Sequence, residues 1–242
     1  MRILHLYHDL MNLYGEYGNI VVLKKHLEDQ GIKVTVDKKT IGDKINFSNY
    51  DFVYCGSGSE RNQDVALDDL LKRKKSFIKA IENDVLMLFT GNAMELLGNA
   101  IDDKECLGII DFDTKKTNER FTGDVIVSNK EIGEVVGFVN KCTIVSEAKK
   151  HLFTYVFKDT NIKDKKTKDE DDNEKYEGYH VGNIYGTHII GPILVKNPNF
   201  MKKIVTILAK KENKKFKYKD ITYQFEEDSY NVTLNALKQR IK

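Results

Sequence analysis

The sequence predicts an α/β fold: a parallel sheet with helices on both faces and an antiparallel β section added to one side. Two observations carry this prediction. In the first half of the chain, short apolar runs alternate with amphipathic segments of helical periodicity, which is typical of a parallel sheet. In the second half, short β-type runs follow one another with few helical segments between them. A length of 242 residues suffices to bury one sizeable core, so we expect one domain with a tail.

The first half is expected to contain four strands and three helices. Ile20, Leu23 and Leu27 recur at helical spacing, and Gly31 follows as a helix stop. Residues 65–84 have the pattern of one long amphipathic helix, and 92–100 that of a short one. The strands are expected at residues 2–7, 32–36, 50–55 and 85–90.

The second half is predicted to add antiparallel strands and to end in helices. Residues 158–177 are almost wholly polar and charged, and we expect a surface loop there. Pro198 is expected to open a helix over 197–211, and residues 229–242 also have a helical pattern. We therefore expect a domain over 1–212 and a C-terminal extension over 213–242. The β-type runs are 107–112, 121–128, 134–140, 142–146, 151–157 and 182–194.

Composition excludes several classes of function. The 39 Lys and Arg residues nearly balance the 37 Asp and Glu residues, so nothing indicates a nucleic-acid partner. No run approaches the roughly 18 apolar residues of a membrane span. Cys55, Cys106 and Cys142 form no Cys-x-x-Cys pair, which suits reduced thiols in the cytoplasm. We expect neither a metal site nor a cofactor.

Several motifs in a fixed order carry a resemblance to a known family. They are "ILHLYHDLMNLYGEYGNI", "DFVYCGSGSERNQ", "GNAMELLG", "LGIIDFDTKKTNERFTGDVIV" and "YGTHIIGPILVKNP". Over about the first 210 residues, the chain resembles the class I glutamine amidotransferases of the cobyric-acid-synthase type. Within them it is most similar to the branch that serves amidation of the lipid II cell-wall precursor. The resemblance implies a flavodoxin-like sheet.

The resemblance also implies a mechanism whose central residues are replaced here. In the family, a cysteine thiolate activated by a histidine attacks glutamine, and the ammonia passes to a Mur-ligase-like, ATP-dependent partner. Gly91 falls at the cysteine position, or Thr90 if the alignment shifts by one, and Ile190 falls at the histidine position. Glu95 replaces the glutamine of the elbow. No catalytic residue is therefore expected to remain, and we expect the turn to be kept because the fold needs it.

Some binding residues of the family pattern are present. Arg120 falls where the family has an arginine that helps to hold glutamine, although a surface arginine is an equal alternative. Gly56 and Gly58 keep the flexible loop of an oxyanion hole, and Asn92 lies beside the elbow. We therefore expect Arg120, Gly56, Gly58 and Asn92 to bind glutamine or a related small ligand, if one binds at all.

Three functions remain open from the sequence. The first is a non-catalytic subunit that binds a Mur-ligase-like partner, with the aromatic tail "FKYKDITYQF" either at that interface or packed on its own domain. The second is an active amidotransferase that uses a displaced residue such as Cys55, although we expect Cys55 in the core and His188 to be an ordinary strand-end histidine. The third is a small-ligand sensor that uses the vacated pocket.

Overall fold

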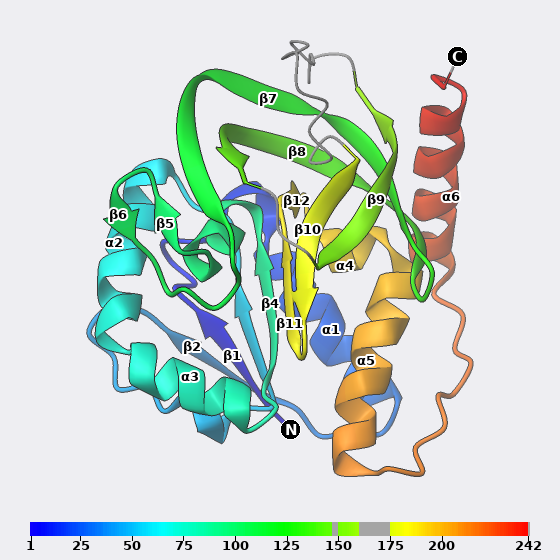
Figure 1. Cartoon of the computed structure of the whole chain (residues 1–242). Helices are drawn as coiled ribbons and strands as arrows, with labels where there is room; N and C mark the ends of the chain where they lie inside the picture. Colours follow the sequence, from blue (N-terminus) through cyan, green and yellow to red (C-terminus); the bar gives the residue numbers. More distant parts are fainter. Residues whose placement is uncertain (147–149, 160–174, 242) are drawn as a thin grey trace.

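One half of the sheet is parallel. The computed structural model describes residues 1–146, 150–159 and 175–241. The parallel strands run in the order β2-β1-β3-β4-β11, so that β1 lies between β2 and β3 (Figure 1). These strands are β1 (Arg2–Leu6), β2 (Thr35–Lys39), β3 (Phe52–Cys55), β4 (Leu86–Thr90) and β11 (Ile184–Thr187).

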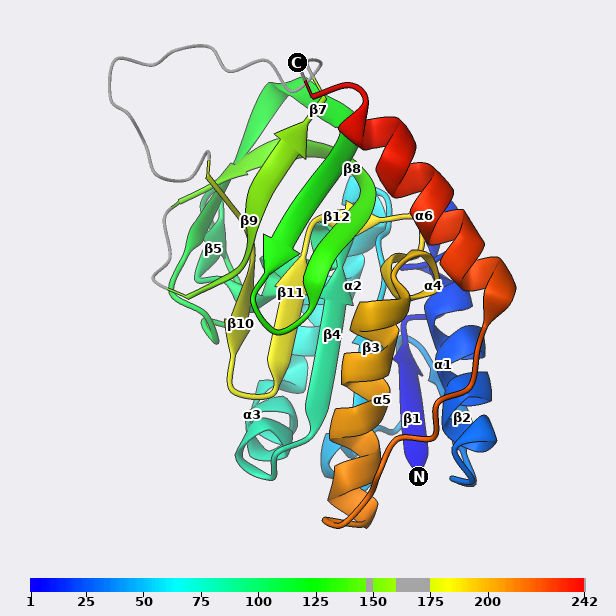
Figure 2. The same ribbon diagram turned by 90° about the vertical axis from the view of Figure 1, so that its right-hand side faces the viewer.

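The other half of the sheet is antiparallel and continues from β11. Its order is β10-β9-β7-β8-β12, and the long strands β7 and β8 arch over one end of the parallel strands (Figure 2). This arrangement confirms the predicted fold class, including the added antiparallel section. The strands are β5 (Ala100–Ile101), β6 (Lys104–Glu105), β7 (Asp113–Asn129), β8 (Gly133–Val145), β9 (His151–Lys158), β10 (Tyr176–Val181) and β12 (Ile189–Ile190).

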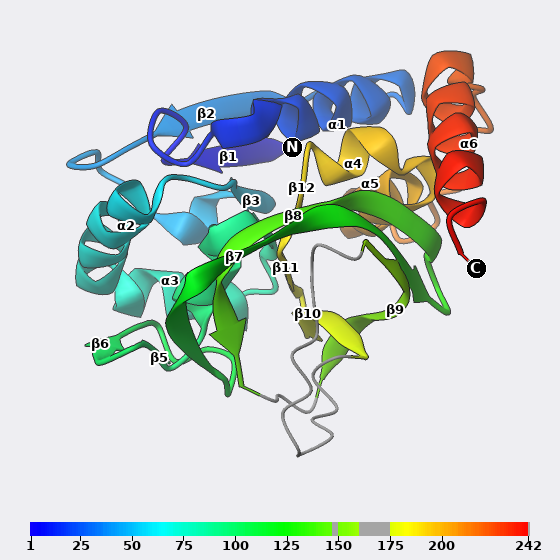
Figure 3. The ribbon, with the colours of Figure 1, turned by 90° about the horizontal axis from the view of Figure 1, so that it is seen from above.

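Helices cover both faces of the parallel strands, as seen from above in Figure 3. Successive side chains of a strand point to opposite faces, so each strand contributes residues to the core on either side of the sheet. Phe52 and Tyr54 of β3 pack with the α1 and α5 side, whereas Val53 and Cys55 pack with the α2 and α3 side. The helices are α1 (Tyr17–Asp29), α2 (Glu60–Lys72), α3 (Lys74–Glu82), α4 (Ile193–Lys196) and α5 (Pro198–Glu212).

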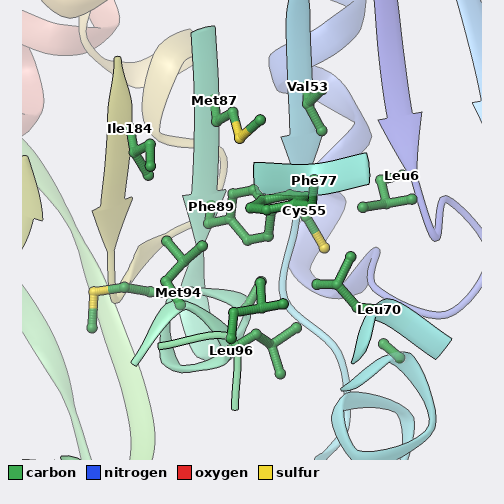
Figure 4. Close-up of a cluster of buried hydrophobic side chains, with 14 of the residues drawn as sticks. Leu6, Val53, Cys55, Leu70, Phe77, Met87, Phe89, Met94, Leu96 and Ile184 are labelled. Atoms are coloured by element: carbon green, nitrogen blue, oxygen red, sulfur yellow. The ribbon is translucent and has the colours of Figure 1, made fainter. Parts of the chain in front are cut away.

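Figure 4 shows the core on the side of α2 and α3. Phe77 of α3 is fully buried and meets Phe47 and Phe89 edge to face, with ring centroids 5.3 and 5.9 Å away. Cys55 lies in the same cluster with no exposed surface, as expected of core filler. Apolar burial of this kind is the main source of stability for the α/β layer.

The prediction of one continuous helix over 65–84 is wrong, because the structure has two helices there. Arg73, at φ −101° and ψ 2°, separates α2 from α3, and α3 turns to pack against the short helix η2 (Phe47–Asn49). The predicted start at residue 65 is also wrong, because α2 begins at Glu60. Ser59 caps the helix there: its hydroxyl accepts a hydrogen bond from the backbone N–H of Asn62. Periodicity alone does not report such a break, because the apolar positions continue on both sides of it.

Four predicted strands also need correction. Residues 107–112 form no strand, because the N–H groups of Leu107, Ile109 and Ile110 bind carbonyls of the short helix after β4 instead. The two runs at 134–140 and 142–146 belong to the single strand β8. The strand predicted at 32–36 lies at 35–39. Most of the predicted charged loop, residues 160–174, lies outside the described residues, and its ends belong to β9 and β10.

The C-terminal extension folds back on the domain. Phe216 and Tyr218 pack against the core on the α1 and α5 side, and the Tyr223 ring stacks on His26 of α1 at 3.7 Å between centroids. The final helix, α6 (Gln224–Lys238), lies across β7 and β8 (Figure 2). Its Leu234 and Leu237 pack against Ile126 and Val136. Most tail aromatics are therefore bound within the chain, while Phe225 of α6 stays 93% exposed.

These contacts lead to a stability prediction. Phe77→Ala should lower the free energy of unfolding by about 3–5 kcal/mol, because it removes a buried ring and leaves a cavity between Phe47 and Phe89. Phe225→Ala is the matched control and should change it by no more than about 0.5 kcal/mol. Urea unfolding followed by circular dichroism measures both. Equal losses in the two variants would contradict the packing described here.

Candidate functional site

The turn after β4 has the backbone of a nucleophile elbow, and the elbow residue is Gly91. Gly91 has φ +59° and opens the short helix η3 (Gly91–Leu97). A catalytic side chain at such a turn is held in a strained left-handed conformation, which glycine adopts without a Cβ clash. Thr90 is the last, extended residue of β4, at φ −116° and ψ 153°. The geometry therefore favours Gly91 over Thr90 as the position that corresponds to a nucleophile.

The space that a nucleophile would need is filled. A β-carbon built on Gly91 would lie 2.5 Å from both Cβ and Oγ of Ser57 and 2.9 Å from Cγ2 of Ile190. Non-bonded carbon atoms do not approach this closely, so any side chain at position 91 would displace one of these neighbours. Gly91 and Ile190 are both buried. The side chains of Ser57 and Ile190 thus fill the space beside Gly91 in which a thiol and an imidazole would meet.

A buried carboxylate stands beside the elbow, and sequence reasoning missed it. Glu16 is fully buried; it accepts hydrogen bonds from the Tyr54 hydroxyl at 2.6 Å, from the Thr90 hydroxyl and from the backbone N–H of Gly191 at 3.0 Å. Burial raises the pKa of the Glu16 carboxyl, and these hydrogen bonds counteract the rise. The carboxylate contacts the backbone of Gly191, next to position 190, but Ile190 has no side-chain N–H for it to orient.

Above the closed elbow lies an open, polar cleft with a volume of about 180 Å³. Of the four residues predicted to bind a ligand, Arg120, Gly58 and Asn92 line it. Gly56 does not; it is packed beneath, where a β-carbon would lie 2.8 Å from the Met11 carbonyl oxygen. The remaining lining residues are Leu13, Tyr14, Ser57, Ser59, Glu60, Gln63, Glu95, Lys116, Asn140, Lys141, Cys142 and Thr143.

Arg120 lies at the cleft but already has protein partners. Its guanidinium donates to Glu60 Oε1 at 2.8 Å and to Asn140 Oδ1 at 2.9 Å, and half of its side chain is exposed. The hydrogen bond from Arg120 lowers the pKa of the Glu60 carboxyl. A ligand carboxylate would therefore have to compete with Glu60 for the guanidinium. That Arg120 binds glutamine stays a prediction.

Asn92 holds the loop rather than pointing a free amide at the cleft. Its Nδ2 donates to the Gly58 carbonyl at 2.9 Å, while its Oδ1 accepts from the Gly58 N–H at 2.9 Å and from the Ser57 hydroxyl at 3.2 Å. Through these two hydrogen bonds to the Gly58 backbone, the Asn92 side chain links η3 to the loop that precedes α2. Asn92 therefore fixes the cleft floor, and the Gly58 N–H is not free to bind an oxyanion.

The inner wall contains a buried ionisable cluster. Glu95 is 1% exposed and accepts hydrogen bonds from Gln63 at 2.7 Å, from the Thr143 hydroxyl and from His188 Nε2 at 3.2 Å. Burial lowers the pKa of His188 to about 4, so its imidazole is neutral at pH 7. Behind it, Glu177 Oε1 accepts a hydrogen bond from the backbone N–H of His188 at 2.7 Å. His188 is thus part of a buried network rather than an ordinary strand-end histidine.

No cysteine has the environment of a nucleophile. Burial raises the thiol pKa of Cys55, and that of Cys106 to about 12. Cys142 lines the cleft, but its thiol donates to Glu60 Oε1 at 3.3 Å, and burial together with that carboxylate raises its pKa. Reactive cysteines instead need a lowered pKa beside a cation or an imidazolium. The active-enzyme hypothesis therefore finds no support at these three thiols.

The fold and the elbow define the class of protein, and comparison with known proteins agrees. Residues 2–198 match the CobB/CobQ-like glutamine amidotransferase domain, so the chain belongs to that family. It is 34% identical over 221 residues to lipid II isoglutaminyl synthase (glutamine-hydrolyzing) subunit GatD of Streptococcus pneumoniae, with 88% of this chain and 82% of that protein covered. The Staphylococcus aureus subunit GatD is 29% identical over 247 residues, with 100% and 98% covered.

Solved structures share the fold at low sequence identity. PurLQS from Thermotoga maritima superposes with a TM-score of 0.54 at 14% identity, covering 87% of this chain and 98% of that one. A glutamine amidotransferase from the same organism gives 0.51 at 11% identity, covering 99% and 97%. At this identity the likeness concerns the fold alone. Within the described part of the chain, no helix has the length and apolar character needed to cross a bilayer.

The filled elbow predicts which substitutions would reopen it. Gly91→Cys with Ile190→His should misfit, because Ser57 still occupies the Cβ position; we expect about 1–3 kcal/mol of destabilisation. Adding Ser57→Gly should relieve the contact and bring the introduced thiol beside an imidazole. Its pKa should then fall below the free-cysteine value of about 8.5. The pH profile of alkylation, read by peptide mass spectrometry, measures it, and identical profiles in the two variants would contradict the steric account.

The buried cluster predicts a pH dependence of stability. Burial raises the pKa of Glu177 from 4.5 to about 7, so the folded state holds a proton that the unfolded state releases. Stability from this group is full below about pH 4.5 and falls as pH rises towards 7, by up to about 1.4 kcal/mol per unit. Relative to Glu177→Gln, the wild type should therefore lose stability between pH 5 and 7.

Urea unfolding at several pH values tests this, with the exposed Glu227→Gln as the control variant. The difference between wild type and Glu177→Gln should change across that window, whereas the difference for Glu227→Gln should stay constant. A pH-independent difference for Glu177→Gln would show that this carboxyl has an ordinary pKa.

Proposed function

We propose that this chain is a non-catalytic amidotransferase-like subunit that binds a Mur-ligase-like, ATP-dependent partner in amidation of a cell-wall precursor. The observation that carries the proposal is the elbow: glycine stands at the nucleophile position, and Ser57 and Ile190 occupy the room that a thiol and its base would need. A fold kept without its nucleophile is consistent with selection for another role. Family membership and similarity to two GatD subunits favour the D-glutamate residue of lipid II as the amidated group.

The exterior offers a candidate contact surface for such a partner. On α6, Phe225 is 93% exposed and Val232 is 70% exposed. The two are seven residues apart, so they lie on the same face of the helix, opposite Leu234 and Leu237. Exposed aromatic side chains are common anchors of protein interfaces. In this proposal the ligase takes ammonia from solution or from another source.

The proposal predicts inactivity together with association. The purified chain, alone or with its Mur-ligase-like partner, should release no ammonia from glutamine above a heat-treated control. The glutamine-hydrolyzing lipid II isoglutaminyl synthase of Streptococcus pneumoniae, which contains subunit GatD, serves as the positive control. With the partner, the two chains should co-elute in size exclusion at micromolar concentration. Phe225→Asp should weaken that complex, while Asn231→Asp, elsewhere on the same helix, should not.

Two results would contradict the proposal. Glutamine turnover that is lost on replacing Cys142 or Thr90 would mean that a displaced residue acts as nucleophile. Separate elution of the two chains would mean that the retained fold does not serve a ligase, and a ligand-sensing role would then be favoured.

A further inference from the structure

The cleft above the closed elbow is lined by three cationic side chains on neighbouring strands. Lys116 and Arg120 come from β7 and Lys141 from β8. Two carboxylates share the cleft, but each is already used: Glu60 accepts from Arg120, and Glu95 accepts from three neutral or histidine donors. The cleft therefore holds more positive charge than its own acceptors neutralise by direct contact.

Lys141 is the least compensated of these cations. Among the described residues, its ammonium has no hydrogen-bond or ion-pair partner, although Glu95 and Glu177 act on it through space. Its side chain is half-buried, and burial lowers its pKa. A desolvated charge without a direct partner costs free energy, and proteins usually compensate such a charge with a counter-ion.

The remaining surroundings also suit an anion. Among the described residues, the Lys116 ammonium has Asp64 as its ion-pair partner, at 4.0 Å, and its side chain is exposed. The 13-residue helix α2 begins at the cleft, with Ser59 as its N-cap, and the N-terminus of a helix favours negative charge. The walls add polar groups from Asn140 and Thr143. Because Ser57 closes the floor, a ligand would sit in the cleft without reaching Gly91.

We propose that this cleft binds the oxyanion group of a small metabolite, a carboxylate or a phosphate, with Lys141 as its main counter-ion. A volume of about 180 Å³ admits a small molecule rather than a polymer. Three cations line the cleft, and glutamine brings one carboxylate and a neutral amide, so we expect a ligand with a second negative charge to bind more tightly than glutamine. This inference does not depend on the ligase partner, because the cleft and the exposed face of α6 are separate surfaces.

Isothermal titration of the full chain tests the proposal. The probes are inorganic phosphate, succinate, L-glutamate and L-glutamine, at constant ionic strength. At least one anion should bind saturably and more tightly than glutamine, and the phosphate and carboxylate arms distinguish the two oxyanions. Lys141→Met should weaken that binding by about tenfold or more, equal to about 1.4 kcal/mol. Lys141→Arg, which keeps the charge, should retain most of it.

Lys115→Met is the matched control, since Lys115 neighbours Lys116 on β7 but does not line the cleft. It should bind the anion like the wild type, and circular dichroism checks that every variant is folded. The inference is overturned if no anion binds saturably, if Lys141→Met binds as well as wild type, or if glutamine binds best. Co-elution with the ligase should be unchanged in Lys141→Met, so failure here is distinguishable from failure of the proposed function.

Discussion

The carboxylate of Glu16 is the interaction on which the geometry of the elbow depends. It joins the start of α1 to β3 through Tyr54, to β4 through Thr90 and to the turn before α4 through Gly191. Because the carboxylate is buried, losing any of these donors would leave a costly unsatisfied charge. None of these hydrogen bonds involves position 91. The turn is thus held by its surroundings rather than by the residue at position 91.

Gly91, Ser57 and Ile190 differ from the family pattern and lie together in space. A β-carbon built on Gly91 would lie 2.5 Å from Ser57 and 2.9 Å from Ile190, and all three residues are buried. The floor of the site is therefore closely packed, while the cleft above it is open and lined mainly by polar residues. In the proposed function, the cleft keeps its access to small ligands while the elbow carries no chemistry.

The sequence was most successful where a signal is local. Short apolar runs predicted the strands β1, β3 and β4, and Pro198 opens α5 as predicted. The sequence did not predict the helix break at Arg73, because the apolar periodicity continues on both sides of that break. It also missed Glu16, Glu177 and Lys141. Each looks like an ordinary charged residue until distant segments bury it against its partners.

The sequence by itself determined the fold class, the family resemblance and the absence of Cys and His from the two expected positions, since these depend only on residue identity and order. It left open whether Thr90 or Gly91 stands at the elbow, and whether Arg120 faces a pocket or solvent. Only the tertiary structure decided these points. Backbone φ at Gly91, the 2.5 Å approach to Ser57 and the pairing of Arg120 with Glu60 arise between segments far apart in the chain. Local sequence does not encode such distances, because they are set by how the sheet and its crossing strands pack.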